Sequence, residues 1–398
     1  MDLTYGPQYE AFRAQVRGFL EARREEAPRA GIGLGGLASR ERMLAWQRTL
    51  IEHGYAARTI PREYGGFGAQ PDLVQSIIID EEFARAGASR GIAGQGPSML
   101  VPTLLEHGSE EQKRKYVGPT VRGELIWCQG YSEPGAGSDL ASLQTRAADA
   151  GDSFVINGQK IWTSTAREAD MIFALVRTEP DSPKHEGISY LVFPMSTPGI
   201  EVRPLHTLTG NAEFNEVFFS DVRVPKSSLV GRRGEGWKIG NTTLRHERNM
   251  LGNSSQTESM LASLVTLMET ETVGGARAID SPVLCDRLAR LEAAVLAMKY
   301  HAMRLLTCQL RGESPGVAGL IVKLQGCELN HQLSALALDV LGELGPLHRS
   351  SPHERAHGAW PFQWMFSLGL IIGGGTAQIQ KNIIAERGLG LPREPKAA

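Results

Sequence analysis

Cysteine is scarce in this sequence, and its four cysteines stand far apart (Cys128, Cys285, Cys308, Cys327). None of them forms a CxxC pair, and no histidine accompanies one at the spacing of a metal site. The pattern argues against a disulfide framework and against a bound metal. We therefore expect four reduced, buried or half-buried thiols and no metal site.

A strong charge of one sign and a long apolar run are also missing. Lys and Arg number 42 and Asp and Glu number 44 among 398 residues, a formal net charge of −2. This near-balance argues against a nucleic-acid partner. No apolar run reaches the roughly 18–20 residues that a membrane span needs. The first segment has neither the basic start nor the apolar core of a secretion signal, so we expect a cytoplasmic protein without a membrane span.

The residue pattern divides the chain into three blocks, at 1–125, 126–233 and 234–398. In the first block, the segment PDLVQSIIIDEEFARAG has apolar residues at helical spacing. Ser109 and Gln112 stand in the relation of a capping box, which predicts a helix start. We predict an N-terminal helical domain from these signals.

The middle block is rich in short β-type runs separated by turn residues. Such runs flank Asn157-Gly158, a dipeptide that predicts a hairpin turn. Further runs are MIFALVRT, GISYLVFPM, IEVRPLHTL and NEVFFSDVRVP. Short strands over about 100 residues predict a small antiparallel β-barrel or sandwich.

The third block is helical again. Ser281-Pro282, Ser314-Pro315 and Ser351-Pro352 each place a capping serine before a proline, which predicts three helix starts. Residues 317–342 form a long run with apolar residues on several helical faces, as in a buried helix of a bundle. The chain is thus predicted to be an α+β multidomain protein.

A glycine pattern near the N-terminus formally matches the dinucleotide-binding motif GxGxxG (Gly31, Gly33, Gly36). The motif binds a dinucleotide when it follows a strand and opens a helix. Here it follows ARREEAPRA, which has no strand character, so we do not assign it that function.

Two polar segments of the middle block have the composition of a ligand site. The loop WCQGYSEPGAGSDL combines glycines with Ser132, Ser138 and Asp139, and can present backbone N–H groups to a phosphate or a planar polar edge. The segment KIWTS sets the flat Trp162 beside two hydroxyl groups, which suits a planar heterocycle. An ordinary polar loop and a core tryptophan are the alternatives.

A third candidate is the segment TLRHERNM in the last block. Glu247 could act as a catalytic base if it is partly buried and has access to an acidic C–H. The alternative is a solvated helix face bearing three neighbouring charges. Composition alone does not separate these two interpretations.

Together these segments resemble the acyl-CoA dehydrogenase family. YSEPGAGSD resembles the flavin-loop signature of that family, with Ser132 where threonine is usual. INGQKIWTS resembles its second flavin segment, and GGGTAQIQKNIIAERGLGLPRE its C-terminal signature. The resemblance runs through essentially the whole chain. It implies the family fold: a helical domain, a middle β domain and a C-terminal four-helix bundle.

The resemblance also implies a reaction. It implies bound FAD and an acyl-CoA thioester that is oxidised to the trans-2-enoyl-CoA. A carboxylate removes the α-proton while the β-hydrogen leaves as hydride to the flavin N5. An electron-transfer flavoprotein is the implied electron acceptor.

Residue roles follow by position in the matching motifs. Tyr131 and Ser132 are expected at the flavin ring edge, and Gly137 and Ser138 near the pyrophosphate or the acyl chain. Trp162 is expected to cover the flavin, with Thr163 and Ser164 at its polar edge. The other expected cofactor contacts are Thr376, Gln378 and, towards the site of a neighbouring subunit, Gly345.

The expected catalytic carboxylate is missing from the C-terminal motif. Most straight-chain members carry glutamate directly before the Gly-Thr of that motif, where this chain has Gly374. A branch that includes isovaleryl-CoA dehydrogenases carries it on the first long C-terminal helix, directly before an arginine. Glu247 and Arg248 match that pattern, so Glu247 is the predicted base and Arg248 a predicted substrate contact. Gly374 leaves room beside the flavin for a branched or bulky acyl group.

Two alternatives remain open. Oxidases and flavin monooxygenases share the family fold and are compatible with a relocated base. A non-catalytic subunit is the second, because an arginine motif that many members use on the cofactor is not evident here. The family forms homodimers, homotetramers and, in sterol side-chain members, heterotetramers with a paralogue.

Overall fold

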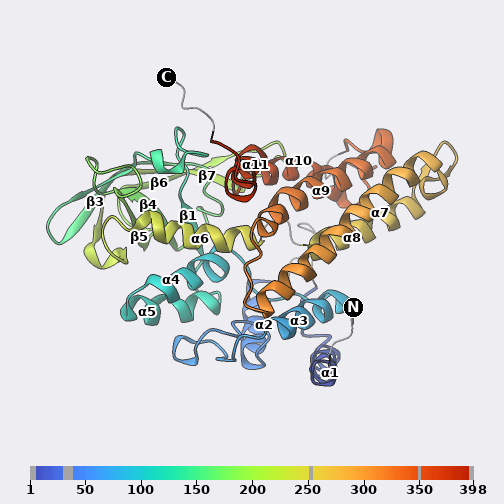
Figure 1. The fold of residues 1–398 in the computed structure, drawn as a ribbon, viewed down its shortest axis with the longest axis horizontal. Helices are drawn as coiled ribbons and strands as arrows, with labels where there is room; N and C mark the ends of the chain where they lie inside the picture. The colour runs from blue at the N-terminus through green and yellow to red at the C-terminus, as the bar shows by residue number, and fades with distance from the viewer. Residues whose placement is uncertain (1–5, 30–38, 251–253, 348–350, 394–398) are drawn as a thin grey trace. The chain divides into compact units, whose positions relative to one another are not determined.

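The computed structural model describes residues 6–29, 39–250, 254–347 and 351–393, with the backbone alone at residues 248–250 (Figure 1). Helices come first, strands follow, and helices return, in the predicted order. The helices before the sheet are α1 (Pro7–Ala22), α2 (Arg40–Glu52), α3 (Leu73–Ala86), α4 (Val101–His107) and α5 (Glu110–Val121). The predicted capping box is confirmed, because Ser109 and Gln112 bond reciprocally at the start of α5. The GxGxxG pattern lies outside the described residues.

The chain divides into two compact units. The first comprises Met1–Thr207 and Asn211–His246, and the second Leu208–Gly210 and Glu247–Ala398. The domain limits predicted at residues 125 and 233 stay predictions, because the compact units divide the chain differently.

The first unit contains the sheet. Its strands are β1 (Trp127–Gly130), β2 (Arg146–Asp149), β3 (Ser153–Lys160), β4 (Met171–Arg177), β5 (Ile188–Pro194), β6 (Ile200–Leu205), β7 (Phe214–Pro225) and β8 (Leu229–Val230). They follow the order β6-β7-β3-β2-β4-β5-β8, with β1 beside β4. Antiparallel pairs predominate, and β1 and β2 are parallel to β4.

The hairpin predicted at Asn157-Gly158 is wrong. Strand β3 runs straight through this dipeptide and pairs with β7 on both sides of it, with a register shift between Ile156 and Gly158. The Asn157 side chain donates to Asp221 Oδ1 at 3.0 Å and accepts from the Asp221 backbone N–H. A Cβ at Gly158 would come within 2.9 Å of three atoms of Thr145. The glycine therefore marks a bulge with a close backbone approach rather than a turn.

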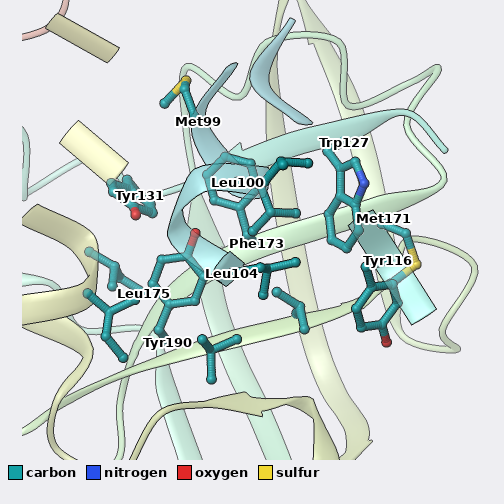
Figure 2. Close-up of a cluster of buried hydrophobic side chains, with 14 of the residues drawn as sticks. Met99, Leu100, Leu104, Tyr116, Trp127, Tyr131, Met171, Phe173, Leu175 and Tyr190 are labelled. Atoms are coloured by element: carbon teal, nitrogen blue, oxygen red, sulfur yellow. The ribbon is translucent and has the colours of Figure 1, made fainter. Parts of the chain in front are cut away.

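One hydrophobic cluster joins the helices of the first unit to its sheet. Figure 2 shows Met99, Leu100 and Leu104 packed with side chains from the strands. The strand residues include Phe173 on β4 and Tyr190 on β5, whose rings stack with centroids 6.1 Å apart. Because this core has contributions from both kinds of element, helices and sheet form a single compact unit.

A buried carboxylate ties α1 to α3. Glu82 on α3 accepts hydrogen bonds from Arg13 and Arg17 on α1 and from Arg85 on its own helix. The hydrogen bonds from Arg17, followed after the opposing effect of burial by those from Arg13 and Arg85, lower the pKa of Glu82 from 4.5 to about 2. The ionised carboxylate is the form that the fold stabilises.

Glu82→Gln is expected to lower the free energy of unfolding by about 3 kcal/mol at pH 7, because three guanidinium groups lose their charged partner. The stabilisation by Glu82 is present above pH 4.5 and is lost as the pH falls towards 2. The difference between the variant and the parent should therefore shrink in acid. Urea unfolding at several pH values measures it. Glu81→Gln removes a more exposed carboxylate of the same helix and should lower the free energy of unfolding by less than about 1 kcal/mol. A loss equal to that of Glu82→Gln would contradict the assignment of the stabilisation to Glu82.

The C-terminal helices are α6 (Gly236–Met250), α7 (Ser254–Thr270), α8 (Pro282–Leu310), α9 (Ala318–Leu341), α10 (Ala359–Ile372) and α11 (Ala377–Ile383), with a small ribbon of β9 (Thr272–Val273) and β10 (Ala276–Arg277) between α7 and α8. In the second unit, α7, α8, α9 and α10 pack against one another as a bundle. Its core includes Leu264, Leu288, Leu336 and Trp360, one from each of these helices. As predicted, α9 is buried on several faces.

One of the three predicted Ser-Pro helix starts is confirmed and two are wrong. Ser281 caps α8 and accepts from the Leu284 N–H. Ser314 instead accepts from the Gly316 N–H, and helix α9 begins at Ala318. Ser351 likewise accepts from the His353 N–H, and the next α-helix begins at Ala359. Both serines bond two residues ahead, as in a tight turn, and so do not cap a helix.

The four cysteines are free thiols, and Cys128 and Cys327 are buried. Within the described ranges, no helix is long and apolar enough to cross a membrane.

Candidate active site

In the first unit, the structure brings the two predicted flavin segments side by side. Lys160, the last residue of β3, donates through Nζ to Tyr131 O at 3.0 Å. The next backbone N–H, that of Ile161, donates to Ser132 O at 2.9 Å. The loop after β1 is thereby held against the end of β3. Two segments 30 residues apart in the chain therefore lie against each other.

A buried ion pair stabilises this junction. Lys160 Nζ also donates to Glu133 Oε1 at 2.8 Å, and the ammonium is fully buried. The Glu133 carboxylate accepts further from the backbone N–H groups of Gln144 and Thr145. Burial opposes the ionisation of Glu133, but Lys160 and these hydrogen bonds lower its pKa below the usual value. The charged carboxylate of Glu133, itself a residue of the loop, therefore anchors the loop to Lys160 and to the backbone of residues 144 and 145.

An aromatic platform and a buried hydroxyl follow the junction. Trp162 is 58% exposed, has a left-handed φ of 59°, and meets Phe214 edge-on with ring centroids 5.9 Å apart. Thr163 is fully buried, and its Oγ1 has no hydrogen-bond partner within the described residues. Its backbone is fixed by two hydrogen bonds with Asn215. An exposed indole beside an unsatisfied buried hydroxyl fits a flat ligand with a polar edge.

The other predicted contacts of this unit differ in exposure. Gly137 and Ser138 lie exposed in the loop, and Ser132 and Ser164 are half-buried. A Cβ at Gly137 would meet nothing within 4 Å, so the backbone there is open to a ligand.

The ring of Tyr131 packs in the hydrophobic core. Its ring is 4% exposed and lies in the core of the first unit, edge-on to both Phe173 and Tyr190 (Figure 2). Its carbonyl is bound by Lys160. The contact of Tyr131 with the flavin ring edge stays a prediction.

In the second unit, the glycine motif forms a tight turn between α10 and α11. Gly374 and Gly375 have φ values of 64° and 96°, which side chains rarely adopt. Gln380 Nε2 donates to Gly374 O at 3.2 Å. Lys323 Nζ, from α9, donates to Ile371 O at 2.9 Å and to Gly375 O at 2.6 Å. Two polar side chains from outside the turn, Lys323 and Gln380, thus bind its carbonyl oxygens.

Glu247, the predicted base, lies half-buried on α6. Glu247 and Gly374, about 130 residues apart in sequence, belong to the same compact unit. The side chain of Arg248 lies outside the described part of the structure.

The remaining predicted contacts also belong to the second unit. Thr376 caps α11 by accepting from the Ile379 N–H at 3.2 Å, and Gln378 is exposed on that helix. Gly345 is buried in the turn after α9, where a Cβ would approach Leu338 O to 2.9 Å.

Sequence reasoning missed the buried polar residues that hold these segments: Glu133, Lys160, Asn215, Lys323 and Gln380. Each lies within or next to a motif or a long helix. The partners are distant in sequence except for Gln380, which bonds Gly374 six residues away. A lysine within a β-type run was the available signal for Lys160, and a lysine among the apolar residues of 317–342 the signal for Lys323.

Comparison with known proteins defines the class to which this arrangement belongs. Models of the acyl-CoA dehydrogenase N-terminal, middle and C-terminal domains match residues 6–124, 128–222 and 234–389. The chain belongs to the acyl-CoA dehydrogenase family. Its members are flavoprotein oxidoreductases that act on CH–CH bonds of acyl-CoA, and this chain is such an enzyme.

Particular relatives are mycobacterial. The chain is 39% identical to acyl-CoA dehydrogenase IpdE1 of Mycobacterium tuberculosis over 97% of its own length and 99% of that protein. Among solved structures, it is similar to the ChsE4-ChsE5 complex of the same organism, with a TM-score of 0.81, 35% identity and coverage of 99% and 100%. A structure described as the Tcur3481-Tcur3483 steroid ACAD gives a TM-score of 0.81 at 30% identity, with the same coverage.

Proposed function

We propose that this chain is an FAD-dependent acyl-CoA dehydrogenase that uses Glu247 as its base and desaturates a bulky, polycyclic acyl-CoA thioester. One observation carries the proposal. Glu247 lies half-buried on α6 and belongs to the same compact unit as the Gly374 turn, where the C-terminal motif has no carboxylate. The resemblance assigns the base of most straight-chain members to that motif.

The residues of the first unit fit FAD. The exposed Trp162 offers a flat face, and the unpaired Oγ1 of Thr163 offers a donor to a ring edge. The glycines of the loop at 135–137 have open backbone for a phosphate. FAD, when bound, supplies the two-electron acceptor for the oxidation.

The protein's own contribution is to accept a proton and to shape the pocket. A half-buried carboxylate can abstract the α-proton because partial desolvation raises its basicity relative to water. Gly374 carries no side chain, which leaves space for a wide acyl group. The steroid description of a similar structure supports a polycyclic substrate.

An anaerobic panel of acyl-CoAs tests this function. The purified protein with FAD is mixed with straight-chain, branched, aromatic and steroidal thioesters, and loss of visible flavin absorbance is recorded. We expect the steroidal thioester to bleach the flavin fastest. A clear kinetic preference for linear medium-chain substrates would contradict the proposed acyl group.

The reaction of the reduced flavin with air tests the electron acceptor. Fast reoxidation of the reduced flavin in air, with peroxide formation, would favour an oxidase over a dehydrogenase that passes electrons to an electron-transfer flavoprotein.

Thr163→Val is expected to weaken FAD binding about 3- to 10-fold, because one hydrogen bond to the cofactor is lost. The apoprotein should be as stable as the parent or slightly more so, since a buried hydroxyl without a partner is removed. Fluorescence titration with FAD and thermal unfolding of the apoprotein measure the two effects. Thr197→Val, at a half-buried threonine of the same unit whose hydroxyl donates to Pro194 O, is the control. Unchanged FAD affinity in Thr163→Val would exclude the hydroxyl from the cofactor site.

Assembly with a paralogous subunit is a second proposal. It is supported by the ChsE4-ChsE5 complex among similar structures, and by the absence of the family's arginine motif from the segment GGARAIDSPVLCDRLARLE. FAD per subunit in the purified chain tests it. A chain with full FAD and full activity by itself needs no paralogue, whereas a colourless or half-loaded chain calls for one.

A further inference from the structure

The pairing of β3 with β7 changes register just before Thr163. The regular ladder ends at Lys160, which lies opposite Val217. Continued without a shift, this register would place Trp162 opposite Asn215. The Thr163 N–H instead donates to Asn215 O at 3.0 Å. The chain therefore carries one additional residue between Lys160 and Thr163, as in a β-bulge.

The bulge leaves an aromatic ring exposed. Trp162 and Thr165 have left-handed φ values of 59° and 57°, which residues with side chains rarely adopt. The Thr165 N–H donates to Glu213 O at 3.1 Å, so the shifted register continues beyond the bulge. The indole of Trp162 is 58% exposed and meets Phe214, the first residue of β7, edge-on. A bulge redirects a side chain, and here the redirected side chain presents a flat face.

The side chain of Asn215 completes the pairing that the bulge has interrupted. Opposite residues of a regular antiparallel ladder can exchange two backbone hydrogen bonds. Here the Thr163 N–H donates to Asn215 O, but Thr163 O accepts from the side-chain Nδ2 of Asn215 at 3.0 Å. One residue thus holds the N–H and the carbonyl of Thr163. Aspartate and leucine have a similar size but no N–H at this atom, so the contact is specific for asparagine.

The same junction contains two buried polar atoms without a partner. Asn215 is 1% exposed and Thr163 is fully buried. Among the described residues, neither Asn215 Oδ1 nor Thr163 Oγ1 has a hydrogen-bond partner. An unpaired buried acceptor lowers stability, so two of them on residues that bond each other indicate that the junction is not arranged for stability alone.

We propose that Asn215 is a positioning residue of the cofactor site: its side-chain amide holds the bulge in the conformation that presents the Trp162 indole and the Thr163 hydroxyl to a flat ligand. The inference rests on the proposed function, in which this ligand is FAD. Asn215 acts through residues 162 and 163 and needs no contact of its own with the cofactor.

Two variants of the full-length protein test this role. Asn215→Ala removes the amide, and Asn215→Asp keeps its shape but has no donor when the carboxyl is ionised. Asn157→Ala is the control, because Asn157 is an exposed asparagine of β3 whose amide also bonds β7, at Asp221. The measurements are thermal unfolding of the apoprotein, amide hydrogen exchange at Thr163 and Thr165 in the apoprotein, and fluorescence titration with FAD.

We expect Asn215→Ala to exchange the Thr163 amide about 10-fold faster and to bind FAD about 10-fold more weakly, because the bulge loses one of its hydrogen bonds. Its melting temperature should fall by less than about 4 °C, since removal of an unpaired acceptor offsets part of that loss. Asn157→Ala should keep the parental affinity for FAD.

Two further comparisons separate positioning from simple stability. In the double variant with Thr163→Val, the loss of FAD affinity should be smaller than the product of the two single losses, because Asn215 acts through that hydroxyl. Asn215→Asp should bind FAD as weakly as Asn215→Ala at about pH 8 and recover towards the parent in acid, since a protonated carboxyl can donate to Thr163 O.

Two results would overturn the proposal. One is parental FAD affinity in Asn215→Ala. The other is a double variant whose loss equals the product of the single losses, with a large drop in the melting temperature of Asn215→Ala, since that is the behaviour of a purely structural asparagine. If Asn215→Ala fails to fold, the pH dependence of Asn215→Asp decides. Failure of the proposed cofactor is distinct: the parent would then bind no FAD, while the Thr163 amide would still exchange faster in Asn215→Ala.

Discussion

Glu247→Gln is expected to keep bound FAD and native stability while lowering the rate of substrate-dependent flavin bleaching about 1,000-fold. Glutamine has the size and hydrogen-bonding capacity of glutamate, but it cannot accept the α-proton. General-base catalysis contributes roughly 10²–10⁴-fold to such steps. Anaerobic stopped-flow absorbance with the best thioester of the panel measures the loss directly.

A second carboxylate provides the control for this experiment. Glu328 on α9 is also half-buried. Glu328→Gln should therefore alter the local charge by the same amount and leave flavin reduction within a few-fold of the parent. The base is misassigned if Glu328→Gln abolishes reduction while Glu247→Gln does not.

Lys160→Met is expected to lower the free energy of unfolding by about 3–5 kcal/mol, because it leaves the Glu133 carboxylate buried without its cation. It should also weaken FAD binding, since Lys160 holds the carbonyl of Tyr131 as well as Glu133. Urea unfolding of the apoprotein and fluorescence titration with FAD measure the two losses.

The double variant Glu133→Gln with Lys160→Met separates the ion pair from simple packing. Removing both charges should restore part of the stability that Lys160→Met loses. Acid provides an independent check. Because the pKa of Glu133 is lowered in the fold, its stabilisation is present above the usual value of 4.5 and is lost as the pH falls below it. The deficit of Glu133→Gln should therefore shrink in acid; a constant deficit would contradict the charged pair.

Local sequence signals predicted this chain well where the structure depends on near neighbours. The capping box at Ser109 and the cap at Ser281 act within one helical turn, and both are present. The hairpin at Asn157-Gly158 failed because β7 is long enough to pair with β3 on both sides of it. Ser314 and Ser351 failed because a serine can bond two residues ahead as readily as it can cap a helix.

For the candidate site too, the sequence indicated the motifs made of neighbouring residues but not the contacts between distant ones. Motif resemblance proposed the loop at 131–139, the segment around Trp162 and the glycine turn as a site, with Glu247 as its base, and these assignments stay predictions. It did not predict that the ring of Tyr131 packs in a core with Phe173 on β4 and Tyr190 on β5. It did not predict Lys160 or Lys323, whose partners are 27 to 52 residues away.

By itself, the sequence determined the order of helices, strands and helices, the family, and the absence of a carboxylate at Gly374. These follow from periodicity and from residues that are neighbours in the chain. The tertiary structure alone decided which buried charges hold the site, namely Glu133 with Lys160 and Lys323 with the glycine turn. A buried charge is stable only with a partner, and that partner is chosen by the packing of elements far apart in sequence.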